Sequence, residues 1–231
     1  FVPGHAVRLT AYENAMRQRA RLLRDGPSDP VWLDQLEAAM AENGVAVAAA
    51  RREMAMRLSA AESGDFGRIS AFPRAEMAIS GTLEADLSEK PALAVEDGYR
   101  HVLRAARQSD AAIAGTANGP HRSDLTVTNL DKALPADQCS TGEQKALLIA
   151  IILAQARLMA ADRGSPPILL LDEVAAHLDS GRREALYGAI GDLQAQAWMT
   201  GTEPGLFDAM RELARFVAVK DGSLREESWN R

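Results

Sequence analysis

The chain has 231 residues, 47% of them hydrophobic and 25% charged, which is the composition of an ordinary globular protein with one large or two modest domains. Its formal net charge of −6 gives no bulk electrostatic indication of nucleic-acid binding. The single Cys139 excludes an internal disulfide and a CxxC metal site, and it fits a reducing compartment. The longest apolar run, 146–154, is far shorter than the roughly 20 residues of a membrane span.

The N-terminal part of the chain predicts two helices. Residues 5–24 are rich in Ala, Leu and Arg and contain neither Gly nor Pro, which favours a helix. The stretch 25–30, Asp-Gly-Pro-Ser-Asp-Pro, breaks that helix. A second helix is expected from about residue 31 to residue 57 or beyond, with Gly44 as a point where it can split or bend. We expect the two to pack as an antiparallel hairpin, or arm.

The pattern changes after the arm. A short strand is predicted at 77–80, a helix at 95–113 and, because of its period-two alternation, a strand at 125–128. The remaining elements are then expected in the order helix 141–163, strand 168–172, helix 181–196, strand 197–201, helix 205–213, strand 214–220 and a turn at 221–222. This alternation predicts an α/β layer with a partly parallel sheet flanked by helices.

The predicted domains follow from this change of pattern. We expect a helical arm domain over residues 1–113, with a short strand near 75–80. An α/β lobe is expected over residues 114–231. The fold class predicted is therefore α/β, with a helical arm attached.

Two carboxylates end a strongly apolar predicted strand. The segment 168–173 reads Ile-Leu-Leu-Leu-Asp-Glu, and a fully apolar strand is typical of a parallel sheet covered on both faces. Ligands of open α/β sheets bind beyond the carboxyl ends of strands, where Asp172 and Glu173 are expected. Asp172 can hold Mg²⁺ and Glu173 can orient or deprotonate a water. The alternative is a buried strand that runs into an acidic helix-capping loop.

A second segment has the residues of an anion-binding helix start. Ser140 or Thr141 can cap the helix expected at 141–163, and Gly142 lets a ligand approach the backbone closely. The free N–H groups and the dipole of a helix N-terminus favour a phosphate there. The alternative is a well-capped core helix without a ligand.

Taken in order, these segments resemble an ABC-type ATPase. Residues 139–144 resemble its signature motif, residues 168–173 its Walker B strand, and residues 176–179, which end in Asp179, its D-loop. Such enzymes also need a phosphate loop, G-x-x-x-x-G-K-[ST]. None is present, since no lysine of this sequence is followed by Ser or Thr. Because the chain also begins at Phe1 without a leader, we interpret it as part of a longer protein.

Three segments resemble the RecF family of bacterial DNA replication and repair ATPases more closely. They are residues 119–125, Gly-Pro-His-Arg-Ser-Asp-Leu; residues 139–145, Cys-Ser-Thr-Gly-Glu-Gln-Lys; and residues 12–19, Tyr-Glu-Asn-Ala-Met-Arg-Gln-Arg, followed by two leucines. The resemblance runs from the arm to near the C-terminus. It implies a cytoplasmic protein that dimerises on ATP, binds DNA at single-strand gaps and helps a recombination mediator to load recombinase, without a membrane partner.

The resemblance also implies roles for single residues. One subunit would supply Asp172 to Mg²⁺ and Glu173 to the attacking water. The other would supply the signature and D-loop to the same ATP. The cofactor-binding residues implied are Ser140, Thr141, Gly142, Glu143, Gln144, Asp179 and Thr202. Because this chain lacks the phosphate loop, we expect it to bind ATP poorly by itself.

Two departures separate the chain from transporter ATPases. The signature contains Ser-Thr-Gly-Glu-Gln instead of Ser-Gly-Gly-Gln, which favours the repair branch. Transporters also place a histidine after the strand that follows Walker B, whereas residues 198–203 here read Trp-Met-Thr-Gly-Thr-Glu. Thr200 or Thr202 would take the place of the γ-phosphate sensor. A hydroxyl cannot act as a cation, so slow hydrolysis is expected.

Several basic residues outside these motifs are candidates for contacts to DNA or a partner. His121 and Arg122 lie in a predicted turn, which is either such a contact or purely structural. Arg17, Arg19 and Arg21 lie on the first helix, where they form either a phosphate-binding patch or a solvated face.

Three other classes of protein stay open at this point. A transporter ATPase disagrees with the long arm and the missing histidine. A coiled-coil chromosome-maintenance ATPase needs sustained heptads, and the arm is too short for them. The third class is a non-enzymatic interaction module, and the missing phosphate loop is consistent with it.

Overall fold

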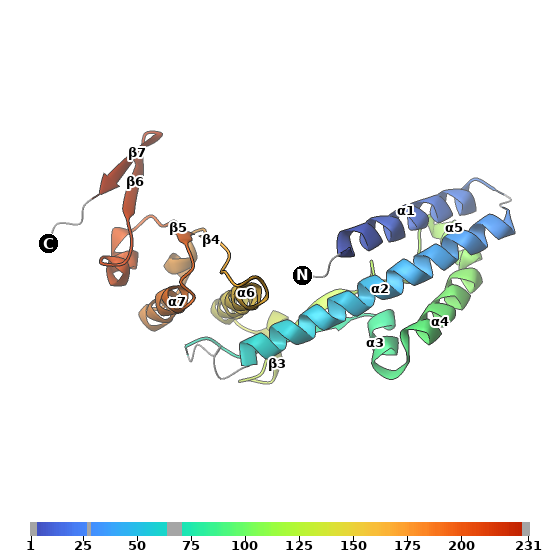
Figure 1. The fold of residues 1–231 in the computed structure, drawn as a ribbon, viewed down its shortest axis with the longest axis horizontal. Helices are drawn as coiled ribbons and strands as arrows, with labels where there is room; N and C mark the ends of the chain where they lie inside the picture. The colour runs from blue at the N-terminus through green and yellow to red at the C-terminus, as the bar shows by residue number, and fades with distance from the viewer. Residues whose placement is uncertain (1–3, 27–28, 64–70, 228–231) are drawn as a thin grey trace. The chain divides into compact units, whose positions relative to one another are not determined.

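The computed structural model describes residues 4–26, 29–63 and 71–227, and it has a mixed α/β fold (Figure 1). The chain forms two compact units. Unit 1 comprises Phe1–Ala60 and Glu76–Thr128, and unit 2 comprises Ala61–Ala75 and Asn129–Arg231. These units are defined by contacts within the chain, so the division into domains at residues 113 and 114 stays a prediction.

Unit 1 is built on two long helices (Figure 1). α1 runs from His5 to Arg24, as predicted, and α2 runs without a break from Pro30 to Ser63. Gly44 therefore does not split the second helix. A Cβ at Gly44 would lie 3.1 Å from the Tyr12 ring of α1, so the glycine allows close packing of the two helices. The remaining elements are β1 (Ala75–Ser80), α3 (Thr82–Glu89), α4 (Ala92–Ala105), α5 (Arg107–Ile113) and β2 (Asp124–Asn129).

The prediction of a single helix at 95–113 is wrong, because the chain forms two helices, α4 and α5, with a break at Ala106. α3 was not expected either. Pro91 explains where α4 begins: it has no N–H to donate and stands in extended backbone just before the first turn. The buried face of α4, formed by Val95, Tyr99 and Leu103, packs on the core that α1 and α2 share.

A fully buried arginine joins the helices of unit 1. Arg19 of α1 has no exposed surface. Its Nε lies 2.9 Å from Glu37 Oε1 of α2, its Nη1 lies 2.7 Å from Asp110 Oδ2 of α5, and its Nη2 donates to the Leu103 carbonyl at 2.7 Å. Arg107 supplies a second cation to Glu37. The charges are therefore paired inside the unit, as burial of a charge requires.

Unit 2 surrounds a short parallel pair of strands. β4 (Leu169–Leu171) pairs in parallel with β5 (Ala197–Met199), and Leu170 stands opposite Trp198. Side chains of α6 (Thr141–Arg163) and α7 (Ser180–Asp192) form one core with Leu169 and Leu171. The other elements are β3 (Leu134–Pro135), η1 (Ala136–Gln138), η2 (Val174–His177), η3 (Pro204–Met210), β6 (Phe216–Lys220) and β7 (Ser223–Glu227).

The C-terminal elements differ from the prediction in two respects. The helix expected at 205–213 is the shorter 3₁₀ segment η3, which is kinked at Phe207. β6 does not end the fold but pairs antiparallel with β7, which was not predicted. The expected turn at Asp221 and Gly222 joins the two strands, and both residues have positive φ, at 50° and 72°. That conformation suits a two-residue hairpin turn.

α6 is long and apolar enough to cross a membrane by length and composition alone. One side of it, however, carries Ala146, Ile149, Ala150 and Leu153, and these residues belong to the core of unit 2. A core helix of a globular protein meets the same criteria, so the apolar sequence of α6 is explained by core packing.

Substitution of the buried arginine tests its part in the fold. We expect Arg19→Met to lower the free energy of unfolding by about 3–5 kcal/mol, because Glu37 and Asp110 lose a buried partner. Denaturation by urea measures this change. Arg17→Met, on the exposed side of the same helix, is the matched control and should change the value by less than about 0.5 kcal/mol. Equal effects of the two substitutions would contradict the structural role of Arg19.

Candidate functional site at the carboxyl edge of the parallel strands

Two polar residues meet where the parallel strands end. Asp172 follows β4 and Thr200 follows β5. Because the strands are parallel, their carboxyl ends lie at the same edge. The Thr200 amide donates to the Leu171 carbonyl at 3.1 Å, which extends the pairing by one residue. The Thr200 hydroxyl then donates to Asp172 Oδ1. The structure thus confirms that Asp172 stands at the end of a core strand.

Glu173 is held in an unusual backbone conformation beside this pair. Its φ of 50° and ψ of 20° lie in the left-handed region, which costs free energy for a residue with a side chain. Its amide donates to Thr200 Oγ1 at 3.0 Å. One hydroxyl therefore contacts the side chain of Asp172 and the backbone of Glu173. The carboxylate of Glu173 is exposed and leaves the edge open to a ligand.

Thr200 is the threonine that contacts the acidic pair. Sequence reasoning left Thr200 and Thr202 open, and selected Thr202 as the cofactor-binding residue. Thr202 is exposed and lies two residues beyond the contact that Thr200 makes. The pairing register of β4 and β5, with Leu171 opposite Met199, decides which threonine comes next to Asp172.

A threonine hydroxyl contacts Asp172 at the place where transporter ATPases have a histidine. The Thr200 hydroxyl fixes the carboxylate of Asp172 and, unlike a protonated histidine, carries no positive charge. Among the described residues, no group of three or more His, Cys, Asp and Glu side chains could hold a metal by itself. Mg²⁺ commonly uses one or two carboxylates together with waters and substrate phosphates, and the Asp172 and Glu173 pair fits that mode.

The predicted signature forms the start of α6. Ser140 is the N-cap: its Oγ accepts from the Glu143 amide at 3.4 Å, and its own amide and hydroxyl both donate to Glu143 Oε2 at 3.0 Å. This is a complete capping box. The Gln144 side chain donates to the Cys139 carbonyl at 3.0 Å. Thr141 and Gly142 are exposed on the first turn, and a Cβ at Gly142 would meet nothing within 4 Å.

A lysine completes the charge balance of this helix start. Lys132, in the turn before β3, forms an ion pair with Glu143 Oε1. Its ammonium, together with the two donors of Ser140, lowers the pKa of Glu143 to about 2. The carboxylate therefore stays ionised at neutral pH. Sequence reasoning missed Lys132, because a single lysine in a turn carries no motif.

Asp179, the last residue of the segment that resembles a D-loop, is the N-cap of α7. Its carboxylate accepts from the Arg182 amide at 2.9 Å and so caps the helix. It also lies 3.6 Å from Arg182 Nε. Arg183 donates to the Leu178 carbonyl at 3.1 Å. These contacts hold the residues 178–179 in place, and the side chain of Asp179 remains exposed.

The turn with His121 and Arg122 belongs to unit 1. His121 Nδ1 lies 2.7 Å from the Tyr12 hydroxyl, and its Nε2 lies 2.9 Å from the Thr116 carbonyl. Burial raises the pKa of Tyr12 to about 12, so that its hydroxyl keeps its proton. Both ring nitrogens of His121 are thus engaged within the unit, whereas Arg122 is exposed and makes one long contact, of 3.4 Å, to the Thr116 carbonyl.

The first helix presents only part of its predicted basic patch. Arg19 cannot contact DNA, because it is fully buried in the ion network of unit 1, and this corrects the expectation. The side chains of Arg17 and Arg21 are exposed by 63% and 78%. Arginine suits both buried ion pairs and contacts to phosphates. The sequence alone therefore does not tell which of the two roles an arginine of α1 has.

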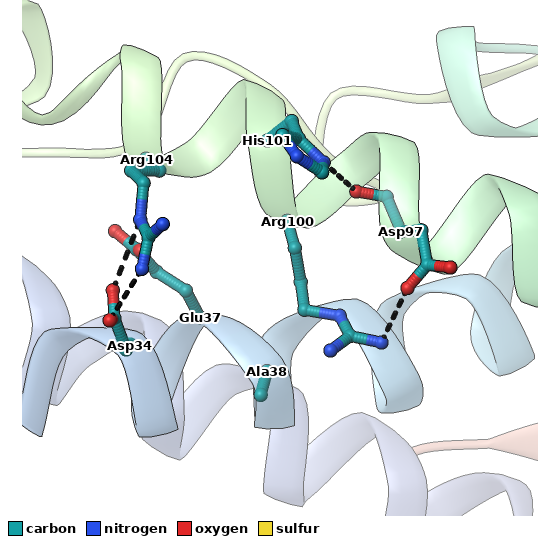
Figure 2. A pocket seen from close by; sticks show the side chains of 7 residues that line it. All are labelled: Asp34, Glu37, Ala38, Asp97, Arg100, His101 and Arg104. Atoms are coloured by element: carbon teal, nitrogen blue, oxygen red, sulfur yellow. Dashed lines mark hydrogen bonds and ion pairs between the residues drawn. The ribbon is translucent and has the colours of Figure 1, made fainter. Parts of the chain in front are cut away.

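A shallow pocket lies between α2 and α4 in the same unit (Figure 2). Figure 2 shows Arg104 of α4 directed at Asp34 of α2, and Arg100 turned to Asp97 of its own helix. The Arg104 Nε lies 3.2 Å from Asp34 Oδ1. Hydrogen bonds from Arg104 and Arg107 lower the pKa of Asp34 to about 2. The charged groups of this pocket are thus largely paired with one another, which makes the pocket part of the helix packing.

One face of the parallel strands is open within the described residues. The sequence predicted a strand covered on both faces, but Leu170 is 78% exposed, and Trp198, its partner in the register, is 60% exposed. The opposite face, with Leu169 and Leu171, lies in the core. Within the described residues, other elements therefore pack against one face of the strand pair, whereas the apolar sequence predicted packing against both faces.

Comparison with known proteins places this chain in a family. Residues 37–202, more than half of the chain, match the domain family described as "AAA domain, putative AbiEii toxin, Type IV TA system". The chain is 50% identical over 222 residues to the DNA replication and repair protein RecF of Mesorhizobium japonicum, and 51% identical over 221 residues to that of Brucella abortus. Each alignment covers 96% of this chain.

Two solved structures of the recombination mediator protein RecF in the RecFOR pathway, with ATPrS and with ATP, share the fold. Their TM-scores are 0.77 and 0.78, at 20% and 19% sequence identity, over 97% and 98% of this chain and 59% of each solved chain. The chain therefore carries the AAA-type domain of this family model and belongs to the RecF family of DNA replication and repair proteins. It spans about 58% of the length of the curated relatives that it matches.

Removal of the Thr200 hydroxyl tests the geometry of the edge. We expect Thr200→Val to speed hydrogen exchange at the Glu173 amide roughly fivefold, because that amide loses the acceptor it has in the structure. Thr202→Val, two residues away, should leave the exchange rate unchanged. Hydrogen exchange followed by NMR or mass spectrometry resolves the difference. Unchanged exchange in Thr200→Val would mean that its hydroxyl does not hold Glu173.

Proposed function

We propose that this chain is the part of a RecF-like ATPase that carries Walker B, the signature and the D-loop, together with a helical arm. The observation that carries the proposal is the shared contact at the strand edge, where Thr200 Oγ1 binds both Asp172 Oδ1 and the Glu173 amide. A loop that only caps a helix does not need its two acidic residues fixed by a neighbouring strand. Membership of the RecF family supports the same conclusion.

The two carboxylates divide the chemistry between them. Asp172, fixed by Thr200, would hold Mg²⁺ through water beside the phosphates of ATP. Glu173 carries an exposed carboxylate one residue beyond and would orient or deprotonate the attacking water. The left-handed backbone of Glu173 turns the chain away from the strand direction, so adjacent residues can serve two different partners. Because Thr200 is not a cation, we expect hydrolysis to be slow.

The signature and the D-loop would act on the ATP of a second subunit. The first turn of α6 exposes Thr141 and Gly142, and Ser140 caps it, so backbone N–H groups and a hydroxyl are available to a γ-phosphate. Glu143, Gln144 and Asp179 would position these groups. Since each half of the site lies on a different subunit, ATP binding and dimerisation are coupled.

The wider function proposed is that of the family. Relatives are named as DNA replication and repair proteins, and the solved neighbours as recombination mediators in the RecFOR pathway. We propose that the full-length protein acts in the cytoplasm, binds DNA at junctions of single and double strands, and works with recombination mediators. We propose that three of the exposed basic residues of unit 1 contact DNA or a partner. They are Arg17 and Arg21 on α1 and Arg122 in the turn after α5.

Substitution of Glu173 tests the catalytic assignment. In the full-length gene product, we expect Glu173→Gln to reduce ATP hydrolysis at least about a hundredfold while ATP-driven dimerisation remains. The amide keeps the shape of the side chain but cannot accept the proton. A steady-state phosphate-release assay and sedimentation velocity with ATP measure the two effects. Hydrolysis at the normal rate would remove Glu173 from the catalytic role.

A second prediction concerns the 231-residue chain by itself. It should show no saturable affinity for Mg-ATP below the millimolar range, because its sequence contains no G-x-x-x-x-G-K-[ST] loop to cradle the phosphates. Isothermal titration calorimetry with Mg-ATP provides the measurement, and AMP serves as a control without the β- and γ-phosphates. Micromolar binding would show that the chain holds a phosphate site of another kind.

A further inference from the structure

The anion-binding end of α6 already holds an anion from its own chain. Glu143 Oε2 accepts from the amide and from the hydroxyl of Ser140, both at 3.0 Å. A γ-phosphate that approaches the signature needs the same hydroxyl and would meet the charge of Glu143. Since the pKa of Glu143 is lowered to about 2, loss of its charge by protonation is not an option at neutral pH.

Lys132 lies on the other oxygen of that carboxylate. It forms its ion pair with Glu143 Oε1, and 54% of its side chain is exposed. The ammonium is therefore placed at the edge of the helix start, from outside the signature. The ion pair raises the pKa of Lys132, so the charge persists at neutral pH.

The turn that presents Lys132 is fixed by contacts of Asn129 and Asp131, which precede it. The buried Asn129 accepts from the Asp131 amide at 3.1 Å, and its Nδ2 lies 3.9 Å from Cys139 Sγ at the start of the signature. Asp131 in turn binds Arg74 through both the amide, at 3.0 Å, and Nε, at 2.7 Å. The position of Lys132 is thus set by contacts that do not depend on Glu143.

We infer that Lys132 is a positioning residue of the signature: it neutralises the carboxylate of Glu143 that lies on Ser140, so that the phosphate of ATP is not repelled from the first turn of α6. This inference rests on the proposed role of the signature at a nucleotide. Without Lys132, the carboxylate stays ionised, is held by Ser140 alone and repels the phosphate. With Lys132, the local charge near the helix start is balanced before ATP arrives.

The test is ATP-driven dimerisation of the full-length gene product, in the Glu173→Gln background so that ATP is not consumed. We expect Lys132→Met to raise the half-saturating ATP concentration roughly fivefold, the upper end for loss of an exposed ion pair. Lys132→Arg should retain the parent value. In the double variant Lys132→Met/Glu143→Gln, the value should return toward that of the parent, because a glutamine can still cap Ser140 but carries no charge.

Two controls separate electrostatic positioning from general damage. Lys90→Met removes a lysine from a comparable exposed ion pair, with Asp86 at 2.6 Å, and should leave the ATP dependence unchanged. The effect of Lys132→Met should shrink as salt is raised, because exposed charges are screened. A shift that persists in the double variant, or that salt does not change, would overturn the positioning role.

A further variant distinguishes this inference from the proposed function. Ser140→Arg places a large cation where the phosphate is expected to bind and should abolish ATP-driven dimerisation. If it does so while Lys132→Met has no effect, the signature role stands and the inference about Lys132 is wrong. If Ser140→Arg has no effect, the signature does not bind nucleotide, and both the proposed function and the inference fail.

Discussion

The parallel pairing of β4 with β5 is the constraint on which the candidate site depends. It brings the ends of two strands, separated in sequence by α7, to one edge. The core residues on α6 and α7 hold the strands in this arrangement through a single buried face. Asp172 and Glu173 then share one hydroxyl of Thr200, and a one-residue shift in register would remove that contact.

The N-terminus of α6 is satisfied by a side chain of its own first turn. A helix N-terminus with free N–H groups attracts an anion, and here Glu143 supplies one from within the chain. The arrangement is stable without a ligand, which makes it compatible with a structural cap as well as with a phosphate site. Lys132 adds a cation that an ordinary capping box does not need, and the inferred role of this helix start at a phosphate rests on that ion pair.

The arm shows that arginine content is ambiguous evidence of nucleic-acid binding. Arg19 lies in the middle of the arginine-rich segment of α1, yet it is an internal partner of Glu37 and Asp110. Its neighbours Arg17 and Arg21 point to solvent. Helical geometry turns successive positions to different faces, so a cluster in the sequence is divided between core and surface.

Local sequence by itself determined the long helices α1, α2 and α6, the strands that bear the site, and the acidic pair at the end of β4. These features depend on nearby residues: apolar periodicity, breakers such as Pro and Gly, and helix caps. Only the tertiary structure decided that Thr200 contacts Asp172, that Arg19 is buried, that residues 95–113 divide into two helices, and that Lys132 reaches Glu143. Each of these depends on strand register or on packing between segments distant in the chain, which no local pattern records.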